Sequence, residues 1–517
     1  MSEAMFSDLA HRLARNFSWL SLQELVIRLI GLATAIYLAR VLAPTDYGAL
    51  GLALAIVNFA SVLVHAGTGT RATRLIARDP ATVPRVHRQI VGFRLGVAAV
   101  CIAVLAGFSG SIAPVFSMPP ELLALCSLLL LRYVYATVWA FRGLDRMNVT
   151  AVADVVEKTL TFAGILLLVR GVGRDLLWAP VVEFAAAMAV AAWMYLRLKS
   201  LYPELRLRPR FDEWKEIARE ALPFSLAGML ASVYLSGGVL LLGWLATAAS
   251  AAMFLVAQKV MLTLALLLQV INNAAFPSAS RLVLQDMPAA LQLARQLMRY
   301  YLVLIVPAFL LVAFHAGEVL TLLFGADYRE AGPVLVILLA ALPFVTATSS
   351  LLMLLKAIPR PLSVLAARSG GAAVLLGLAI VLVPRLDAQG AAIALAVGEA
   401  VSTLLLFVFV RRATGGVPWD LQCTAPLAAG AAAAGLYALV GAWPIWLKLP
   451  VAAAVYVGLA LALRAMTLVE IRDLSRLMFR ALRGPRGAKG ERERSGQDAR
   501  QQSGIERGPQ QDSKDQP

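Results

Sequence analysis

Ten ionisable side chains lie inside long apolar stretches of the sequence, where no water is available to solvate a charge. The basic members of this group are Arg28, Arg94, Arg132, Lys158 and Lys259. The acidic members are Glu24, Asp154, Glu157, Glu183 and Glu399. Ionisable groups inside an apolar span are costly, so they face a cavity, an ion pathway or one another. Basic groups around such a cavity would compensate a phosphate or diphosphate, because a guanidinium fork matches phosphate oxygens.

Several of these groups also have a purely structural interpretation. Glu24 and Arg28 are four residues apart and can neutralise each other on one helix face, and the same spacing joins Asp154 to Lys158. Arg94 lies near the end of its stretch, so its guanidinium can extend to the membrane surface. These five residues are therefore candidates for a binding site and for local contacts alike.

Arg132 and Lys259 lie near the middle of their apolar stretches, too deep for their charges to reach the surface. They are the leading candidates for binding an anionic cargo, with an internal ion pair as the alternative for each. Glu183 and Glu399 have no charged partner nearby in the sequence, so they are candidates for coupling to H⁺ or Na⁺. The remaining candidates for ion coupling are Asp154, Glu157 and Glu24.

Aromatic and amide side chains in the same stretches could bind a sugar. The aromatic candidates are Tyr133, Tyr135, Trp139 and Tyr234. The amide candidates are Gln23, Asn58, Gln258, Gln269, Asn272 and Asn273. The alternative for the aromatic residues is the belt of rings found where a helix leaves the membrane.

The sequence carries no motif for nucleotide or metal chemistry. It contains no Gly-x-x-x-x-Gly-Lys loop, no His-Glu-x-x-His pair and no Cys-x-x-Cys pair. We therefore expect a protein that is not an enzyme and has no cofactor. A membrane glycosyltransferase or polymerase would need a sizeable extramembrane catalytic loop, and the longest predicted outer loop, around residues 318–330, is too short for one.

The elements that must position these residues are membrane-spanning helices. Of the 517 residues, 60% are hydrophobic and 15% are charged, with a mean hydropathy of +0.75. Soluble domains are about 25% charged and under half apolar. The fold class is therefore an all-α polytopic membrane protein, and the net charge of +16 needs no nucleic-acid partner to explain it.

A spanning helix needs about 20 apolar residues, which predicts about 14 spans. They cover residues 17–41, 47–68, 89–109, 121–141, 149–170, 176–196, 222–245, 251–276, 300–316, 332–355, 362–384, 388–410, 422–440 and 446–467. Loops on one side then hold 22 Lys and Arg residues, and loops on the other side hold six. Because positive loops remain in the cytoplasm, both termini are predicted to be cytoplasmic.

The predicted spans divide the chain into segments. They are a cytoplasmic amphipathic arm (1–16), six spans (17–199), a cytoplasmic linker with an interfacial helix (200–221), six spans (222–412), two peripheral spans (413–467) and a basic, largely disordered tail (468–517). The interfacial helix is expected because Phe211, Trp214, Ile217 and Ala221 share one face. Basic faces of this kind indicate contact with anionic membrane lipids.

Residues 38–50 and 241–253 form a weak repeat, in which Leu-Ala, a four-residue break and a small-small-large triplet recur after 203 residues. Six predicted spans separate the two copies. An even number of spans preserves orientation, so the two six-helix lobes would be parallel repeats related by an axis along the membrane normal.

Two segments resemble a known family. Ala-Arg-Val-Leu-Ala-Pro-Thr-Asp-Tyr-Gly (residues 39–48), followed by His-Ala-Gly-Thr-Gly-Thr-Arg (residues 65–71), is similar to the opening of the polysaccharide-biosynthesis flippases of the multidrug/oligosaccharidyl-lipid/polysaccharide exporter superfamily. Val-Leu-Thr-Leu-Leu-Phe-Gly-Ala-Asp-Tyr (residues 319–328) resembles the turn that those proteins carry between spans nine and ten. The resemblance covers the chain through the last span.

This resemblance implies two pseudo-symmetric six-helix lobes and two peripheral C-terminal helices, with a cavity that opens alternately to each side. It implies a bacterial inner-membrane flippase that moves an undecaprenyl-pyrophosphate-linked oligosaccharide to the periplasmic leaflet for O-antigen, exopolysaccharide or capsule synthesis. Glycosyltransferases and a polysaccharide polymerase are the partners to be expected. The alternatives are a multidrug exporter coupled to Na⁺ or H⁺, a lipid II flippase and, less favoured, a membrane glycosyltransferase or polymerase.

Overall fold

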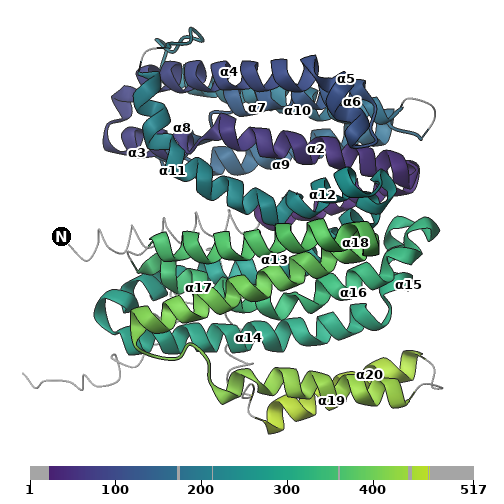
Figure 1. The fold of residues 1–517 in the computed structure, drawn as a ribbon. Helices are drawn as coiled ribbons and strands as arrows, with labels where there is room; N and C mark the ends of the chain where they lie inside the picture. The colour runs from purple at the N-terminus through teal and green to yellow at the C-terminus, as the bar shows by residue number, and fades with distance from the viewer. Residues whose placement is uncertain are drawn as a thin grey trace, which may run out of the picture. The chain divides into compact units, whose positions relative to one another are not determined.

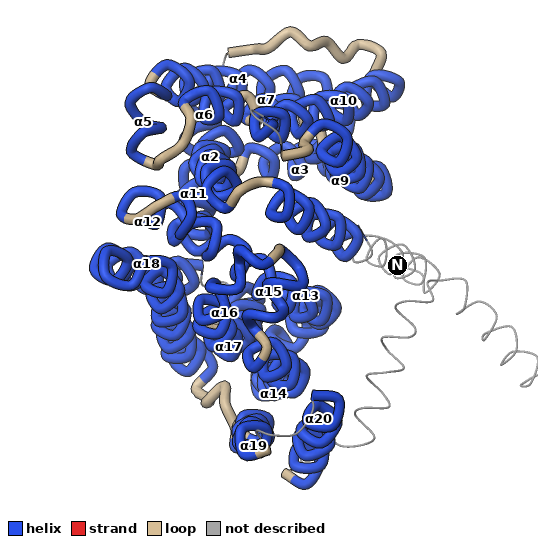
Figure 2. The backbone as a smooth tube through the Cα atoms, turned by 90° about the vertical axis from the view of Figure 1, so that its right-hand side faces the viewer, coloured by secondary structure: helices blue, strands red, loops and turns tan. Residues whose placement is uncertain are grey.

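The computed structural model describes residues 23–171, 175–211, 213–358, 361–440, 445–463 and 465. Within these ranges every regular element is a helix, as the uniformly blue elements of Figure 2 show. The predicted arm (1–16), the start of the first predicted span and the predicted tail (468–517) lie outside the described residues. The chain is an all-helical, multi-span membrane protein (Figure 1).

The first half of the chain begins with a helix over residues 23–41. The helices that follow it are α2 (Pro44–His65), α3 (Thr68–Arg78), α4 (Val83–Gly107), α5 (Ser109–Val115), α6 (Pro120–Ser127), α7 (Leu130–Tyr135), α8 (Val138–Gly143), α9 (Met147–Leu168) and α10 (Trp178–Leu201). Proline at the first position of α2 and α6 starts these helices where the sequence predicts breaks, since proline has no N–H to lose there.

The second half begins with α11 (Trp214–Ser232), which passes through a π-helical turn (Val233–Gly237) into α12 (Gly238–Leu245). The later helices are α13 (Ala248–Gln285), α14 (Met287–Phe314), α15 (Ala316–Phe324), α16 (Gly332–Ala340), α17 (Leu342–Ala357), α18 (Pro361–Thr414), α19 (Ala425–Leu439) and α20 (Ile445–Ala462). The last two pack on each other and on α14, consistent with a peripheral pair.

Nine helical stretches in the described part of the chain are long and apolar enough to cross a membrane. One of them, within α18, is a hairpin, because the chain reverses at Asp387 (φ 50°, ψ −132°). Gly371 consequently lies against the carbonyl of Gly398 on the second helical arm of the hairpin. The break that the sequence predicts after residue 384 is therefore present.

The ends of several helices differ from the predicted spans. Helix α13 has 38 residues and α14 has 28, so both extend well beyond the predicted ranges 251–276 and 300–316. Asp286 separates them and caps α14 by accepting a hydrogen bond from the N–H of Ala289 at 3.0 Å. The predicted ranges were too short because hydropathy identifies only the apolar part of a helix, whereas the helix continues to its capping residue.

The predicted interfacial helix does not form a separate element. Its residues are the first turns of α11, and Trp214 and Ile217 pack on Phe93 and Ala66 of the first half. Gly96 on α4 leaves room for the indole of Trp214, whose ring would lie 2.0 Å from a Cβ at that position. Trp214 and Ile217 of this face are thus covered by protein, whereas Phe211 is 57% exposed.

The two halves meet mainly along α2 and α13. They approach so closely that a Cβ on Gly48 would lie 1.8 Å from the carbonyl oxygen of Ala248. Helix α11 contacts α2 and α18, and α12 packs on α18, α13 and α2. The π-helical turn between them likewise contacts both α2 and α18.

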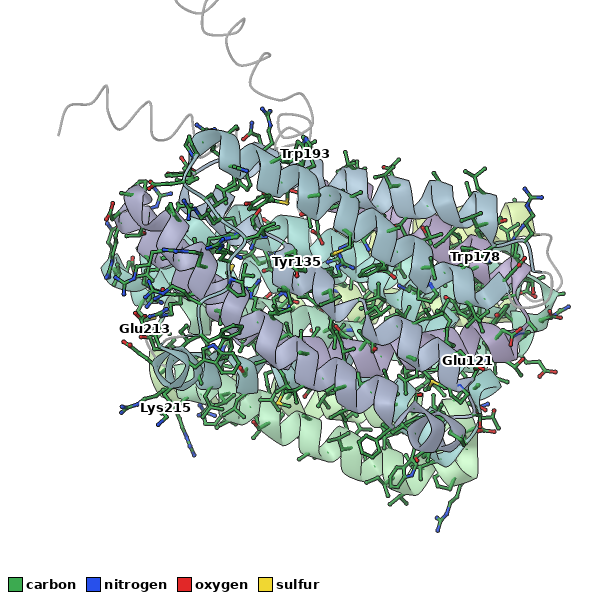
Figure 3. The ribbon with its side chains drawn as sticks, turned by 90° about the horizontal axis from the view of Figure 1, so that it is seen from above. Glu121, Tyr135, Trp178, Trp193, Glu213 and Lys215 are labelled. Atoms are coloured by element: carbon green, nitrogen blue, oxygen red, sulfur yellow. The ribbon has the colours of Figure 1, made fainter. Side chains whose placement is uncertain are left out.

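The helical body has two ends, which carry different helices. Figure 1 places α5, α12 and α15 at one end and α3 and α8 at the other. Figure 3 shows Glu213 and Lys215 at the end with α3 and α8, which we call the Arg74 end, and Glu121 and Trp178 at the opposite end. We call that opposite end the Tyr47 end.

The two segments that carry the family resemblance contact each other at the Tyr47 end. The rings of Tyr47 and Tyr328 meet edge to face, with centroids 6.3 Å apart. Arg40 donates from its guanidinium to the carbonyls of Leu322 and Leu323, the two residues that precede the last residue of α15. Gly325 follows α15 with φ 114°, a conformation that residues with a Cβ rarely adopt. At this end the halves are therefore joined.

Candidate functional site

Arg132, on α7, connects two acidic residues from two other helices. Its Nη2 lies 2.5 Å from Oε1 of Glu157 on α9, and its Nη1 lies 3.1 Å from Oε1 of Glu183 on α10. The Nζ of Lys158 approaches the same oxygen of Glu183 at 3.8 Å. Four of the ionisable residues singled out in the sequence are therefore in contact.

Helix 23–41 takes part in two further contacts of the residues singled out in the sequence. Glu24 and Arg28 form the predicted pair, with Oε1 and Nε 2.6 Å apart. Gln23 donates from Nε2 to Oδ2 of Asp154 at 2.6 Å. Asp154 is thus held by an amide from another helix, and Lys158 pairs with Glu183, so the expected contact between Asp154 and Lys158 is replaced by contacts between helices.

Lys259, on α13, is the member from the second half. Its side chain is exposed, and the charges of Lys158, Glu183 and Arg28, all in the first half, act on it. Among the described residues it makes no ion pair within 4 Å. We call Glu24, Arg28, Arg132, Asp154, Glu157, Lys158, Glu183 and Lys259 the central charge cluster.

Arg94 does not extend to the membrane surface as the structural interpretation allowed. Its side chain is 3% exposed, and its Nε donates to the hydroxyl of Thr68 at 2.9 Å. Its Nη1 donates to the carbonyl of Tyr133 at 2.8 Å. In a continuous helix that carbonyl would accept from the N–H of residue 137, but α7 ends at Tyr135, so Arg94 takes the place of the missing donor.

A pocket of about 700 Å³ lies beside the central charge cluster. All of its lining residues belong to the first half, and they come from α2, α3, α4 and α7 to α10. The charged and aromatic ones are His65, Arg74, Arg94, Arg132, Tyr133, Trp139, Arg142, Asp154 and Glu157. Four arginines face two carboxylates there, so the lining is net positive.

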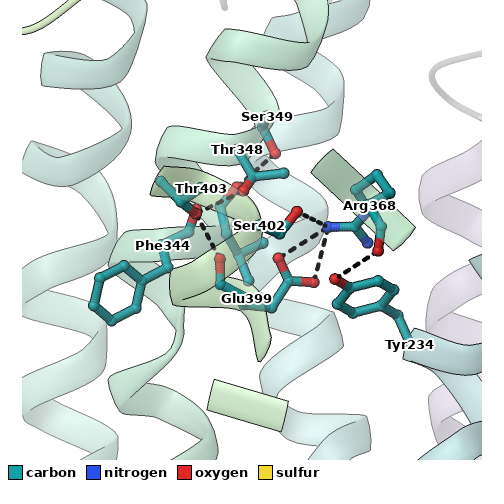
Figure 4. A network of polar contacts seen from close by, with 9 residues as sticks. Tyr234, Phe344, Thr348, Ser349, Arg368, Glu399, Ser402 and Thr403 are labelled. Atoms are coloured by element: carbon teal, nitrogen blue, oxygen red, sulfur yellow. Dashed lines mark hydrogen bonds and ion pairs between the residues drawn. The ribbon is translucent and has the colours of Figure 1, made fainter. Parts of the chain in front are cut away.

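Glu399 lies outside the central charge cluster. Its two carboxylate oxygens accept from Nη1 of Arg368 at 3.2 and 3.0 Å, and Ser402 lies 3.4 Å from the same nitrogen (Figure 4). The guanidinium also covers the ring of Tyr234, 3.6 Å from its centroid. Tyr234, a candidate for sugar binding, is therefore covered by an arginine.

Arg368 is a residue that the sequence interpretation missed, because it was assigned to a cytoplasmic loop. The signal was the tight turn predicted after residue 384. Two antiparallel helices joined there bring positions near 368 beside positions near 399. A buried acid such as Glu399 is costly without a partner, so a basic residue is expected opposite it on the other helix.

No group of three His, Cys, Asp or Glu side chains suited to a metal ion occurs among the residues that the structure describes. The acids of the central charge cluster are held by basic or amide groups instead.

The fold is that of a known class of transporters. It is similar to the lipid II flippase MurJ in an inward closed conformation, with a TM-score of 0.69 and 12% identity over 88% of this chain and 99% of that one. It is also similar to an inward-facing multidrug resistance MATE family transporter of the MOP superfamily, with a TM-score of 0.64 and 15% identity over 76% of this chain and 98% of that one. A MOP superfamily transporter from Pyrococcus furiosus matches with a TM-score of 0.54 and 15% identity, over 78% and 97% of the two chains.

The sequence defines the family more narrowly. The model of the polysaccharide biosynthesis protein family matches residues 13–283, just over half of the chain. The chain belongs to this family, and its fold is like that of MurJ and of MATE transporters of the MOP superfamily. No curated protein sequence is a significant match.

Proposed function

We propose that this transporter moves an undecaprenyl-diphosphate-linked oligosaccharide from the cytoplasmic to the periplasmic leaflet of the bacterial inner membrane. The observation that carries the proposal is Lys259. Its side chain is exposed, and of the three charges that act on it from the first half, those of Lys158, Glu183 and Arg28, two are also positive. A cationic group without a matching acid in a membrane-embedded cluster favours a cargo that brings its own negative charge, as a diphosphate does.

The transport cycle that fits this cargo is alternating access between two six-helix lobes. Fourteen spans follow if the α18 hairpin counts twice and helix 23–41, α9, α19 and α20 are added to the nine long apolar stretches. The asymmetry of Lys and Arg between the loops favours a cytoplasmic Arg74 end and a periplasmic Tyr47 end. Glycosyltransferases would then supply the cargo on one side, and a polymerase would receive it on the other.

A multidrug exporter is the alternative from the same superfamily. Organic cations favour an acidic pocket, whereas the pocket of the first half is lined by four arginines and two carboxylates. A lipid II flippase would carry the same diphosphate, so the cluster does not distinguish it from a flippase for surface polysaccharide. Family membership supports the latter.

Deletion of the gene tests the function directly. The expected result is loss of surface polysaccharide together with undecaprenyl-linked intermediates that remain in the cytoplasmic leaflet. Normal polysaccharide with new drug sensitivity would support the multidrug alternative. Loss of peptidoglycan precursor transport would support lipid II as cargo, and intermediates that reach the periplasmic leaflet unprocessed would contradict flipping as the missing step.

Lys259→Ala tests the observation that carries the proposal. Because Lys259 has no ion-pair partner among the described residues, removing it should leave the unfolding temperature unchanged while lowering export about tenfold or more. Lys215→Ala, at an exposed lysine near the start of α11, is the matched control and should retain export. Normal export by Lys259→Ala would contradict a cationic cargo site at this position.

A further inference from the structure

One of the five acidic residues singled out in the sequence differs from the others in its contacts. Four of them pair with a basic side chain, namely Glu24, Glu157, Glu183 and Glu399. Asp154 makes no ion pair within 4 Å in the described part of the chain, and its hydrogen-bond partner is the neutral amide of Gln23. Asp154 can therefore gain or lose a proton without breaking an ion pair.

Protons can reach Asp154 through the pocket of the first half. Its side chain is half-buried and belongs to the lining of this pocket of about 700 Å³. Arg74 and Arg142 line the same pocket and are exposed residues of α3 and α8, the helices at the Arg74 end (Figure 1). Water that fills the pocket from this end meets the carboxyl group of Asp154.

The amide of Gln23 has one hydrogen-bonding atom that an ionised Asp154 cannot satisfy. Its Nε2 donates to Oδ2 of Asp154 at 2.6 Å, while its Oε1 is buried and has no hydrogen-bond partner among the described residues. An ionised carboxylate offers acceptors alone, whereas a carboxylic acid also has one O–H donor. A protonated Asp154 can therefore accept from Nε2 and donate to Oε1 of the same amide, which removes the cost of a buried acceptor without a donor.

The contact between Gln23 and Asp154 joins two helices of the central charge cluster. Gln23 is next to Glu24 at the start of helix 23–41, and Asp154 lies one turn before Glu157 on α9. A proton on Asp154 favours the docked position of helix 23–41, and loss of the proton favours its release. Proton binding and the position of this helix are therefore linked, and each shifts the other by the same free energy.

The other charged and titratable groups around Asp154 come from each neighbouring helix of the first half. They are Glu157 and Lys158 on α9, Arg132 on α7, Arg142 on α8, Glu183 on α10, Glu24 and Arg28 on helix 23–41, and His65, Arg74 and Arg94 of the pocket lining. The arginines keep their charge at all physiological pH values. The acids among these groups are paired with bases, so His65 is the main competitor of Asp154 for a proton in the pocket.

We propose that Asp154 is the proton-binding residue of the transport cycle and that its protonation holds helix 23–41 against α9. This inference rests on the proposed function. The proton passes between water in the pocket and a carboxylate oxygen of Asp154, and no other covalent bond forms or breaks. Since the proton gradient across a bacterial inner membrane is directed inward, a proton that returns through Asp154 can drive the export of one cargo molecule.

The distribution of cargo between the leaflets of proteoliposomes tests the inference. The probe is the lipid-linked saccharide extracted from cells that lack this gene, and periodate added outside reports the saccharide in the outer leaflet. A pH gradient is imposed while the membrane potential is clamped at zero. With one proton exchanged per cargo molecule, each pH unit should change the ratio of the lipid in the two leaflets about tenfold.

Asp154→Asn should make this ratio independent of the gradient. A carboxamide cannot take up a proton, but it has one donor and one acceptor for the amide of Gln23, so the variant should keep its fold. The matched control is Asp46→Asn, the same change at an exposed aspartate in the first turn of α2. Its ratio should follow the gradient as that of the unmodified protein does.

The outcomes separate this inference from the proposed function. If the unmodified protein moves no lipid, the proposed function fails. If its ratio ignores the gradient, or if the ratio with Asp154→Asn still follows it, the proposed function stands and the proton site is wrong. In the latter case the proton binds elsewhere, and His65→Gln is the next variant.

Asp154→Glu keeps the test decisive should Asp154→Asn move no lipid, because a glutamate can carry the proton. A ratio that follows the gradient in Asp154→Glu supports the proton site. Two inactive variants with unchanged unfolding temperatures would mean that the shape of the aspartate matters rather than its proton, and this result overturns the proposal.

Discussion

Arg132 joins three helices of the first half, α7, α9 and α10. Its two terminal nitrogens contact acids from α9 and α10, and the same side chain lines the pocket. The planar fork of a guanidinium can bridge two carboxylates in this way, whereas a lysine ammonium acts as a single point charge. A structural role and the proposed cargo-binding role therefore fall on one side chain, and experiment must separate them.

Arg132→Ala should abolish export and also lower the stability of the protein. Loss of one member of a buried ion pair costs about 3–5 kcal/mol, because Glu157 then keeps a buried charge. The double variant Arg132→Ala/Glu157→Gln should regain much of the stability without regaining export. Unfolding in detergent and surface polysaccharide are the two measurements. Export restored by the double variant would mean that Arg132 only neutralises Glu157.

The residue contacts that follow local helix geometry could be predicted from the sequence, and the others could not. Glu24 and Arg28 lie one helical turn apart and pair as expected. Lys158 instead pairs with Glu183 on another helix. Which helices are neighbours depends on packing of the whole bundle, and that information is not contained in the spacing of charges along one helix.

At the scale of elements, the hairpin of α18 contains its own buried ion pair. Arg368 on the first arm and Glu399 on the second are 20% and 9% exposed, and Tyr234 from the π-helical turn covers the guanidinium (Figure 4). Glu399 was a candidate for ion coupling on the ground that it had no partner. Since an arginine already neutralises it, we expect the carboxylate to hold the hairpin together.

A double-mutant cycle tests this expectation. Arg368→Ala alone and Glu399→Ala alone should each destabilise the protein by about 3–5 kcal/mol, because each leaves a buried charge behind. The double variant should be markedly more stable than the sum of the two losses and should retain export. Chemical unfolding in detergent provides the free energies. Loss of export in a stable double variant would instead support a role for Glu399 in coupling.

Elements could be located from the sequence more reliably than their ends. The predicted breaks with proline and glycine fall where helices begin or end, since proline suits the first turn of a helix and glycine the position after its end. The polar extensions of α13 and α14 were missed because hydropathy reports only the part of a helix that is apolar. The interruption between α7 and α8 has no proline or glycine, so the sequence predicted one continuous span there.

At the scale of the whole molecule, α2 and α13 hold the two halves together at the Tyr47 end, and in the proposed transport cycle this contact would open and close. Gly48→Ala would place a methyl group 1.8 Å from the carbonyl oxygen of Ala248, so the helices could not approach as they do here. We expect this variant to lose export about tenfold or more, since overpacking of this kind costs about 1–3 kcal/mol. It should also populate a form that is open at the Tyr47 end.

The measurement is labelling, from outside the cell, of a cysteine introduced by Leu52→Cys. The protein without Leu52→Cys gives the background labelling. Leu52 is fully buried and contacts Gly243 of α12. Labelling should rise when Gly48→Ala is added. Gly377→Ala is the matched control, because a Cβ on Gly377 meets nothing within 4 Å. Equal labelling with both glycine variants would argue against closure at this contact.

The charged residues of helix 23–41 and α9 have a consequence for how the protein is made. Each helix carries three charged residues, and a charge at the centre of a spanning helix opposes insertion by about 2.5–3.5 kcal/mol. Neither helix would partition into lipid efficiently by itself during synthesis. Helix α9 must therefore stay beside the translocon until α10 emerges, so that Glu157 and Lys158 enter the bilayer together with Arg132 and Glu183. The order of synthesis thus places the base before its acids, and we expect the central charge cluster to govern when this half of the protein can leave the translocon.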